Sequence, residues 1–566
     1  MLVFVDGKRV GLRMFYAPVP AIERIAFRTG VPRIFPTVDT PADQTYDLPN
    51  AGDQEPLAEY RIANVKTSSV DKDATAAVLE YADFSHYADY FNGMEDENIA
   101  QAIPNAKASE WMEENIPLFE CPQRNFEEMY YYRWWSLRKH IKETPVGYGM
   151  TEFLVQRSYS DKYNLIACAI GHHIYESRWL RDPKYLNQII HTWYRGNDGG
   201  PMNKMNKFSS WNADAVLARY MVDADKDFML DMKENLEAEY QRWECTNRLQ
   251  NGLYWQGDVQ DGMEESISGG RRKKYARPTI NSYMYGNAKA LSLMGILSDD
   301  EGMAMRYGMR ADTLKRLVQD KLWNSRHQFF ETMRADSSAN VREAIGYIPW
   351  YFNLPDTVKQ YEVAWKEIMD ENGFSAPYGL TTAERRHPEF RTHGVGKCEW
   401  DGAIWPFASA QTLTAMANFM NNYPQRVLSD SVYFRQMELY VESQYHRGRP
   451  YIGEYLDEVT GYWLKGDQER SRYYNHSTFN DLMITGLIGL RPRLDDTVEV
   501  NPLIPADKWD WFCLDNVLYH GRNLTILWDK YGDRYHRGKG LRIFVDGKQV
   551  GYADRLTRII CENVLK

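Results

Sequence analysis

The stretches YNLIACAIGHHIYESRWL (residues 163–180) and PKYLNQIIHTWYRG (residues 183–196) lie next to each other in the chain. Each places apolar residues at i, i+3 and i+4, which is the spacing of an amphipathic α-helix. Gly196 then follows the second stretch as a helix-breaking residue. The two stretches therefore predict a hairpin of two helices.

The same pattern recurs through the middle of the chain, which predicts a mainly α protein. Further helical stretches occupy residues 209–244, 279–297, 301–323, 401–423 and 477–490. No βαβ alternation and no glycine-rich phosphate loop interrupts them. An α-solenoid would repeat its sequence with a fixed period of about 33–47 residues, and no such period is visible. We therefore expect residues 61–489 to form a closed toroid of helical hairpins.

The two ends of the chain have a β character. LVFVDGKRVG (residues 2–11) and RIFVDGKQVG (residues 542–551) both place Asp-Gly between short runs rich in β-branched residues, which predicts a hairpin in each. Residues 490–566 alternate apolar and polar positions between turn signals, so we expect a small antiparallel β domain there. Residues 1–60 are expected to be β and irregular, because Pro, Thr and Asp dominate after the first hairpin.

Composition excludes several classes of protein. A net charge of −10 over 566 residues argues against a nucleic-acid partner, whose binding surface would be basic. The sequence contains no run of about 18 apolar residues, so no membrane span is predicted. The start of the chain shows no signal-peptide pattern, and the compartment stays open. Aromatic residues make up 14% of the chain, including 39 Tyr and 17 Trp, which fits either core packing or stacking on sugar rings.

Three polar loops combine carboxylates with aromatic residues. They are NGLYWQGDVQDGMEESISGG (residues 251–270), GVGKCEWDGAIWPFASAQTL (394–413) and GRPYIGEYLDEVTGYWLKGDQERSRYYNHSTFNDL (448–482). Loops on a rigid scaffold are where binding and catalytic residues concentrate. Rings can stack on a sugar while acids bind its hydroxyls, so these loops indicate a carbohydrate site.

Glycoside hydrolysis needs two carboxyl groups on opposite faces of the bond. One group is protonated and donates to the leaving oxygen, and the other is ionised and activates water or attacks the sugar. Glu264 and Glu265 cannot form this pair, because adjacent side chains diverge. We therefore expect the second carboxylate to come from another loop.

The order of these segments resembles the glycoside hydrolases with an (α/α)6 barrel, the six-hairpin glycosidases, and especially family 63 and its mannosylglycerate-hydrolase-like members. In that group the general acid is an Asp within Gly-(Trp/Met)-Asp-x-Ser, and GMEES (residues 262–266) aligns with it. A Trp-x-Gly-x-x-Trp-Pro segment is matched at residues 400–406, and GEYLDEVTG (453–461) loosely matches the stretch that holds the general base. The resemblance covers about residues 125–490 and implies a barrel of helical hairpins.

This resemblance implies Glu264 as the general acid and Glu454 as the general base. Asp261 stays open as a rival acid, Glu399 as a rival base, and structural or helix-capping roles stay open for all four carboxylates. The sequence departs from the family at the acid, where Glu replaces Asp, and after the base, where the chain reads RYYNHSTF (residues 472–479).

The loops and the aromatic-Arg run YYYRWWSLRKHI (residues 130–141) supply the expected substrate contacts. Core packing, helix capping or a structural turn stays open as the alternative for many of these residues. The expected contacts are Asp261, Trp255, Arg133, Trp134, Trp211, Trp400, Asp401, Trp405, Tyr455 and His476.

The sequence therefore predicts an inverting, exo-acting hydrolase of α-linked oligosaccharides with an oligosaccharide as its partner. An inverting enzyme would hold its carboxyl groups about 6.5–9.5 Å apart. No cofactor is expected, because the helical pair His172 and His173 lacks a third ligand nearby, although a structural calcium ion stays open. The alternatives are a polysaccharide lyase or sugar epimerase that uses His476 and Tyr474, and a non-catalytic glycan-binding protein.

Overall fold

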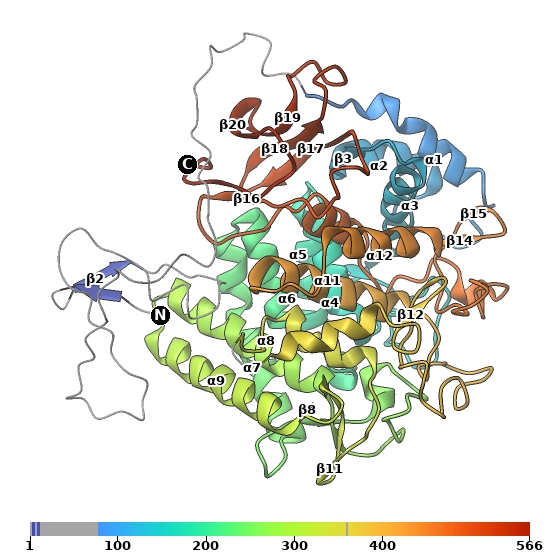
Figure 1. The fold of residues 1–566 in the computed structure, drawn as a ribbon, viewed down its shortest axis with the longest axis vertical. Coiled ribbons are helices and arrows are strands. Elements are labelled where there is room, and N and C mark those ends of the chain that lie inside the picture. The colour runs from blue at the N-terminus through green and yellow to red at the C-terminus, as the bar shows by residue number, and fades with distance from the viewer. Residues whose placement is uncertain (1–2, 6–7, 12–76, 358–359) are drawn as a thin grey trace.

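The computed structural model describes residues 3–5, 8–11, 77–357 and 360–566. The predicted irregular segment between residues 12 and 60 lies outside this part of the chain. The described residues form a helical body with a β region at its C-terminal end (Figure 1). A mainly α fold with a β accessory region is therefore confirmed.

The centre of the body is a closed ring of helices. Each helix of the ring contacts the next, and the last returns to the first. In ring order they are α4 (Ile170–Ser177), α6 (Asn212–Asp223), α8 (Pro278–Leu297), α10 (Ile348–Tyr351), α11 (Pro406–Asn422) and α13 (Asn480–Leu482). A closed toroid, and not an open solenoid, is thus the arrangement of the helical region.

Further helices pack against the ring and against each other (Figure 1). α7 (Lys226–Asn247) and α9 (Glu301–Lys321) contact α8, and α12 (Asp430–Glu442) contacts α11. α3 (Arg124–His140) contacts α12 and α13, and it carries α1 (Ser85–Asn92) and α2 (Ala108–Asn115) on another side. α5 (Pro183–Arg195) packs against a short hairpin of β4 (Ile141–Thr144) and β5 (Gly147–Met150).

Aspartate side chains begin several of the predicted helices. The carboxylates of Asp182, Asp225 and Asp300 accept backbone N–H groups in the first turns of α5, α7 and α9 at 2.9–3.0 Å. In the opening hairpin the first helix is shorter than predicted. The Asp161 carboxylate accepts the N–H groups of Tyr163 and Leu165 at 2.8 and 2.7 Å, and this turn delays the start of α4.

Glycine permits close packing inside the ring at two places. A Cβ on Gly171 of α4 would lie 2.2 Å from the Trp211 ring, and a Cβ on Gly286 of α8 would lie 2.3 Å from the Phe352 ring. Both distances are below any van der Waals contact, so a side chain at either position would displace the ring that fills the space. Aromatic residues therefore fill the space between neighbouring ring helices.

The C-terminal sheet is antiparallel, with strand order β20-β19-β18-β17-β3. Its main strands are β17 (Trp511–Tyr519), β18 (Arg522–Asp529), β19 (Gly540–Val545) and β20 (Lys548–Ala553), and β16 (Val498–Val500) pairs with β21 (Ile559–Cys561) beside it. β3 (Leu118–Glu120) comes from the helical region, with Phe119 opposite Leu514, and was not predicted. Both Asp-Gly hairpins are present, the N-terminal one as β1 (Val3–Val5) and β2 (Lys8–Gly11).

Short strands also occur in the loops of the helical region. A four-stranded sheet consists of β6 (Trp255–Gln256), β7 (Tyr275–Ala276), β10 (Met333–Arg334) and β11 (Ser337–Ser338). The remaining pairs are β8 (Trp323–Asn324) with β9 (Phe329–Phe330), β12 (Ser375–Ala376) with β13 (Gly379–Leu380), and β14 (Tyr445–His446) with β15 (Arg449–Pro450). The loop of residues 257–274, which contains Glu264, connects β6 to β7.

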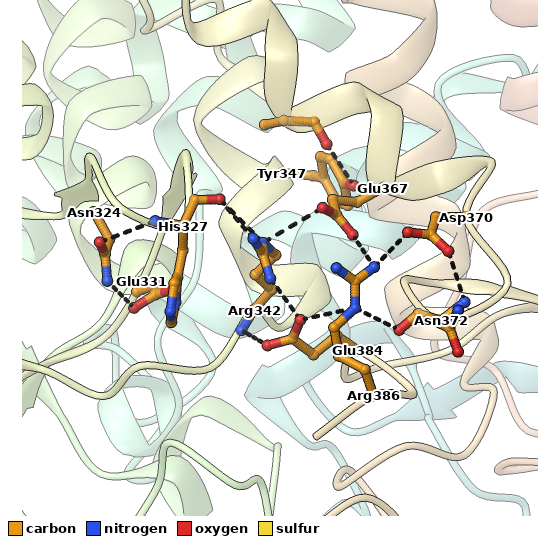
Figure 2. A network of polar contacts seen from close by, with 11 residues as sticks. Asn324, His327, Glu331, Arg342, Tyr347, Glu367, Asp370, Asn372, Glu384 and Arg386 are labelled. Atoms are coloured by element: carbon orange, nitrogen blue, oxygen red, sulfur yellow. Dashed lines mark hydrogen bonds and ion pairs between the residues drawn. The ribbon is translucent and has the colours of Figure 1, made fainter. Parts of the chain in front are cut away.

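Ion pairs and hydrogen bonds connect the segments around Arg342, Glu367 and Glu384 in the helical region (Figure 2). Arg342 donates to the Glu384 carboxylate at 2.7 Å and to the carbonyl of His327 at 2.8 Å. Arg386 pairs with the carboxylates of Glu367 and Asp370 at 2.8 and 2.5 Å. The network holds residues 381–386 in place, and these residues bond in turn to residues 402–403 of the second acidic loop.

None of the described helices is both long and apolar enough to cross a lipid bilayer.

Candidate active site

Three carboxyl groups from distant parts of the chain lie within electrostatic reach of one another. Glu264 lies in the β6–β7 loop, Glu454 follows β15, and Glu152 follows β5. The charge of Glu454 raises the pKa of both Glu264 and Glu152, and the charge of Glu264 raises the pKa of Glu152 as well. The ring of helices thus brings the first and third acidic loops to one site.

The Glu264 carboxyl is suited to hold a proton near neutral pH. Burial raises its pKa to about 7, and the negative charges of Asp258 and Glu454 act in the same direction. The side chain is only partly buried, so a ligand can reach it. Glu264 therefore has the two properties that a general acid needs, which are a proton to donate and access to the substrate.

The Glu454 carboxylate is buried beside a cation and a hydroxyl. Arg470 lies 3.3 Å from Oε2 in an ion pair, and the Ser471 hydroxyl donates to the same oxygen at 3.2 Å. Both partners stabilise the ionised form of a carboxylate. Two carboxyl groups with such different surroundings can divide the acid and base roles between them.

Sequence reasoning missed the third carboxyl group, Glu152. It is buried, and one oxygen accepts a hydrogen bond from the Tyr474 hydroxyl. Within the described part of the chain its other oxygen, Oε2, has no hydrogen-bond partner. Burial raises the pKa of Glu152 to about 8, so the group is mostly protonated at pH 7. No motif surrounds this residue in the sequence, and only its contact with Tyr474 places it at the site.

Aromatic and imidazole rings surround these acids. The ring of His476 lies 3.8 Å from that of Tyr474, 5.9 Å from Phe407 and 6.2 Å from Trp405, measured between centroids. His172 lies 4.6 Å from Phe407 on the other side. Among the residues that the structure describes, neither ring nitrogen of His172 or His476 has a hydrogen-bond partner. Buried polar atoms of this kind need a ligand or water to satisfy them.

Three of the predicted sugar-stacking rings stack on one another. The Trp405 ring lies 4.5 Å from Trp400 on one side and 4.5 Å from Tyr455 on the other, with interplanar angles of 20° and 18°. All three are buried. Both faces of Trp405 are therefore covered, and the stack forms a wall whose Trp405 edge faces His476. Their direct contact with substrate stays a prediction.

Asp261 has partners that give it a structural role, and its roles as a substrate contact or rival acid stay predictions. Its side chain is fully buried and pairs with Arg277, Nε to Oδ2, at 2.7 Å. The hydroxyls of Ser209 and Thr279 donate to the same carboxylate. All three partners donate hydrogen bonds to this carboxylate. Asp261 thus anchors the loop that presents Glu264.

Asp261→Asn should lower the free energy of unfolding by about 3–5 kcal/mol, because it leaves the buried Arg277 guanidinium without its counter-charge. Urea unfolding at pH 7 measures the change. Glu265→Gln is the matched control in the same loop, since its partner Arg271 is 58% exposed and the loss should stay below about 1 kcal/mol. Equal losses in the two variants would contradict the anchoring role of Asp261.

Arg133 and Trp134 are both buried, and their contacts with substrate stay predictions. Arg133 is buried and donates to Gln444 Oε1 at 2.8 Å and to the carbonyl oxygen of Ser477 at 2.6 Å, so its guanidinium holds the chain before α13. Trp134 has no exposed surface and packs edge-on against Tyr130 in the core. Arg133 therefore helps to position the segment that carries His476.

Asp401 and Glu399 both stabilise the turn in the second acidic loop. Asp401 accepts the backbone N–H groups of His393 and Gly394 at 2.6 and 3.1 Å and is fully buried. Glu399 pairs with Arg391. Among the described residues Oδ1 of Asp401 has no hydrogen-bond partner, so its contact with substrate stays a prediction, and Glu399 has a cationic partner.

Trp211 and Trp255 differ in their exposure. Trp211 is fully buried at the start of α6, 4.8 Å from the Tyr283 ring and 5.0 Å from the His172 ring. Trp255 is half-buried on β6, with the Lys274 ammonium 4.4 Å from its ring centre. Substrate contact by these two residues stays a prediction, with Trp255 the more accessible.

The described residues contain no group of three or more His, Cys, Asp or Glu side chains arranged to hold a metal ion. The adjacent His172 and His173 point to different neighbours, since His173 bonds the carbonyl of Asn475 at 2.8 Å and His172 packs between rings.

Residues 162–477 match the family described as "Mannosylglycerate hydrolase MGH1-like glycoside hydrolase domain", which covers more than half of the chain. The chain belongs to this family. The predicted resemblance and the predicted class of enzyme, a glycoside hydrolase, are thus confirmed. Glu264 and Glu454 lie inside the matched range of the MGH1-like domain, and Glu152 lies ten residues before it.

Two further matches flank the MGH1-like domain. Residues 490–551 match "Glycosyl hydrolase family 65, C-terminal domain", which coincides with most of the C-terminal β region. Residues 1–44 match "Sialidase-like, CBM domain".

Solved structures similar to this MGH1-like chain include one named "Sialidase", which is 88% identical over all of this chain with a TM-score of 0.86. This chain spans 52% of that structure's length. A family GH78 rhamnosidase of a Bacillus species is 11% identical over 73% of this chain and 40% of its own, with a TM-score of 0.50, and shows the fold alone. A GH63 mannosylglycerate hydrolase from Thermus thermophilus is 13% identical over 63% of this chain and 99% of its own, with a TM-score of 0.46.

Proposed function

We propose that this chain is an inverting, exo-acting hydrolase of α-linked oligosaccharides, with Glu264 as the general acid and Glu454 as the general base. The contrast between the two carboxyl groups carries the proposal. Burial raises the pKa of Glu264 to about 7, while the Glu454 carboxylate contacts the Arg470 guanidinium and the Ser471 hydroxyl. Exo action and the α-linkage rest on the resemblance to family 63.

In the proposed reaction Glu264 donates its proton to the leaving oxygen as the bond from that oxygen to the anomeric carbon breaks. Glu454 removes a proton from a water molecule, whose oxygen forms the new bond on the opposite face of the sugar. After the reaction Glu264 is ionised and Glu454 is protonated. One proton transfer through solvent restores the starting state, and no cofactor takes part in this cycle.

Glu152 supports the proposal as a neutral partner for the substrate. Because its carboxyl is mostly protonated, it adds little negative charge beside Glu454. Its oxygen Oε2 is free of protein partners among the described residues and can bind a sugar hydroxyl. The orphaned nitrogens of His172 and His476 can bind further hydroxyls in the same way.

The anomer that is released first tests the stereochemical part of the proposal. A panel of α- and β-linked aryl glycosides and disaccharides identifies a substrate, and proton NMR during the first turnovers follows the anomeric signal. We expect the β-anomer from an α-linked substrate. Release of the α-anomer would mean retention and would contradict the role of Glu454 as a base for water.

The structure named "Sialidase" raises a second candidate, the release of sialic acid. Sialidases use a tyrosine nucleophile, and Tyr474 with its bond to Glu152 is the one pair at the described site that suits this chemistry. Burial raises the pKa of Tyr474 well above its usual range and that of Glu152 to about 8, which opposes ionisation of the tyrosine. Loss of sialic acid release in Tyr474→Phe, with activity retained in Glu454→Gln, would favour this candidate.

A further inference from the structure

A cleft of about 510 Å³ lies away from the three carboxyl groups. It opens between the β14–β15 hairpin, α3 and the loop of residues 466–473. Neither Glu152, Glu264 nor Glu454 lines it. Its volume is within the range of small-molecule sites in proteins, which is about 300–1,000 Å³.

Two buried tyrosines line this cleft with unsatisfied hydroxyls. Tyr132 of α3 has 0% of its surface exposed and Tyr473 has 3%, and both belong to the lining. Over the described ranges, the Tyr132 hydroxyl has no hydrogen-bond partner. The Tyr473 hydroxyl lies outside good hydrogen-bond geometry but interacts with the Glu95 carboxylate, and burial together with the charge of Glu95 raises the pKa of that phenol. A buried hydroxyl without a partner is costly, so these groups, and Tyr132 above all, point to a ligand or water in the cleft.

The cleft lining contains three arginines, Arg447, Arg449 and Arg472, and two carboxylates, Asp467 and Glu469. Arg449 of β15 is exposed and, within the part of the chain described, has no ion-pair partner. Arg472 is only weakly paired, because its nearest carboxylate oxygen, on Glu469, is 3.9 Å away. A guanidinium can hold a carboxylate through two parallel hydrogen bonds, which gives both affinity and orientation.

One segment separates the cleft from the catalytic acids. Tyr474 and Ser471 point to the acids, since they donate to Glu152 and Glu454. Their neighbours Tyr473 and Arg472 line the cleft on the other side. Tyr473 has a φ of 60°, in the left-handed region, and its side chain lines the cleft while that of Tyr474 bonds to Glu152.

We propose that this cleft is a second saccharide-binding site, distinct from the catalytic acids, and that it takes a sugar bearing a carboxylate. Arg449 and Arg472 bind the carboxylate, and the Tyr132 and Tyr473 hydroxyls bind ring hydroxyls of the same sugar. Family membership supports the saccharide, and the unpaired Arg449 supports the negative charge. The proposal concerns binding and does not depend on the roles proposed for Glu264 and Glu454.

Calorimetric titration of the full chain with glucuronic acid and with glucose tests this site, because the two ligands differ only in the carboxylate. We expect glucuronate to bind at least about 10-fold more tightly than glucose. Arg449→Ala should weaken glucuronate binding about 10-fold, because it removes one of the two guanidinium partners. Tyr132→Phe should weaken both sugars by a smaller factor. Glu264→Gln should leave glucuronate binding unchanged, which separates this site from the catalytic one.

Arg316→Ala is the matched control, since Arg316 is an exposed arginine on the outer helix α9, and it should bind like the unmodified chain. Equal affinity for glucose and glucuronate, or unchanged binding in Arg449→Ala, would overturn the proposal. Inorganic sulfate that displaces glucuronate at equal concentration would also overturn it, because the cleft would then select an anion without the sugar. Arg449 is exposed, so its variant should fold, and circular dichroism checks this.

Discussion

Glu264→Gln should lower kcat/KM for a glycoside with a poor leaving group by about 100- to 10,000-fold, because the amide cannot donate the proton that the leaving oxygen needs. A dinitrophenyl glycoside needs no such proton, so its hydrolysis should fall by less than about 10-fold in the same variant. Steady-state kinetics with the two substrates measures both effects. The difference between them isolates the loss of acid catalysis from any general damage to the site.

Glu265→Gln is the control for this prediction. Glu265 is the adjacent residue in the loop and forms an ion pair with the exposed Arg271, so its variant should keep nearly full activity on both substrates. If Glu264→Gln lost equal activity on the two glycosides, the residue would not be the acid. Glu152, whose pKa is about 8, would then be the next carboxyl group to test.

Glu454→Gln should lower kcat/KM by about 100- to 10,000-fold for both leaving groups, because the attack of water needs the base whichever group departs. The variant keeps a side chain of the same size beside Arg470 and Ser471, so the loss reports the missing charge. Melting temperatures of the variant and the parent chain identify any loss that comes from misfolding.

The rival base provides the comparison for Glu454. Glu399 pairs with Arg391 and accepts the backbone N–H of Gly396 at 3.1 Å. Glu399→Gln should therefore affect stability more than turnover, with more than about a tenth of the activity left in the folded fraction. Nearly complete loss in folded Glu399→Gln, together with activity in Glu454→Gln, would reverse the assignment.

The helical body could be predicted from sequence because its signals are local. Apolar spacing fixed the helices, and Asp182, Asp225 and Asp300 begin α5, α7 and α9 through bonds to residues two or three positions away. The strand β3 could not be predicted, since three residues carry no period and their partners lie near residue 514. The same holds for the two-residue strands in the loops.

Site residues were predicted only where a motif surrounds them. Glu264 and Glu454 have one each, whereas Glu152 is defined by Tyr474, which lies 322 residues further along the chain. The ion pair of Asp261 could not be predicted for a similar reason, because its partner Arg277 lies at the start of α8 and the contact is invisible in the loop sequence.

Aromatic residues posed a different difficulty. Trp134 and Trp255 both occur in aromatic-rich stretches, yet one is fully buried and the other is half-exposed. The same chemical property, a large apolar ring, suits a protein core and a sugar face equally well. Sequence composition therefore indicated a carbohydrate site but could not say which rings line it.

The most direct test of the account is the dependence of kcat/KM on pH with a dinitrophenyl glycoside and with an unactivated glycoside. With the unactivated glycoside, kcat/KM of the parent chain should fall above an apparent pKa of about 7, where Glu264 gives up its proton. With the dinitrophenyl glycoside, Glu264→Gln should show no such fall. An alkaline decline that persists in Glu264→Gln and disappears in Glu152→Gln would contradict the account, because the proton would then come from Glu152.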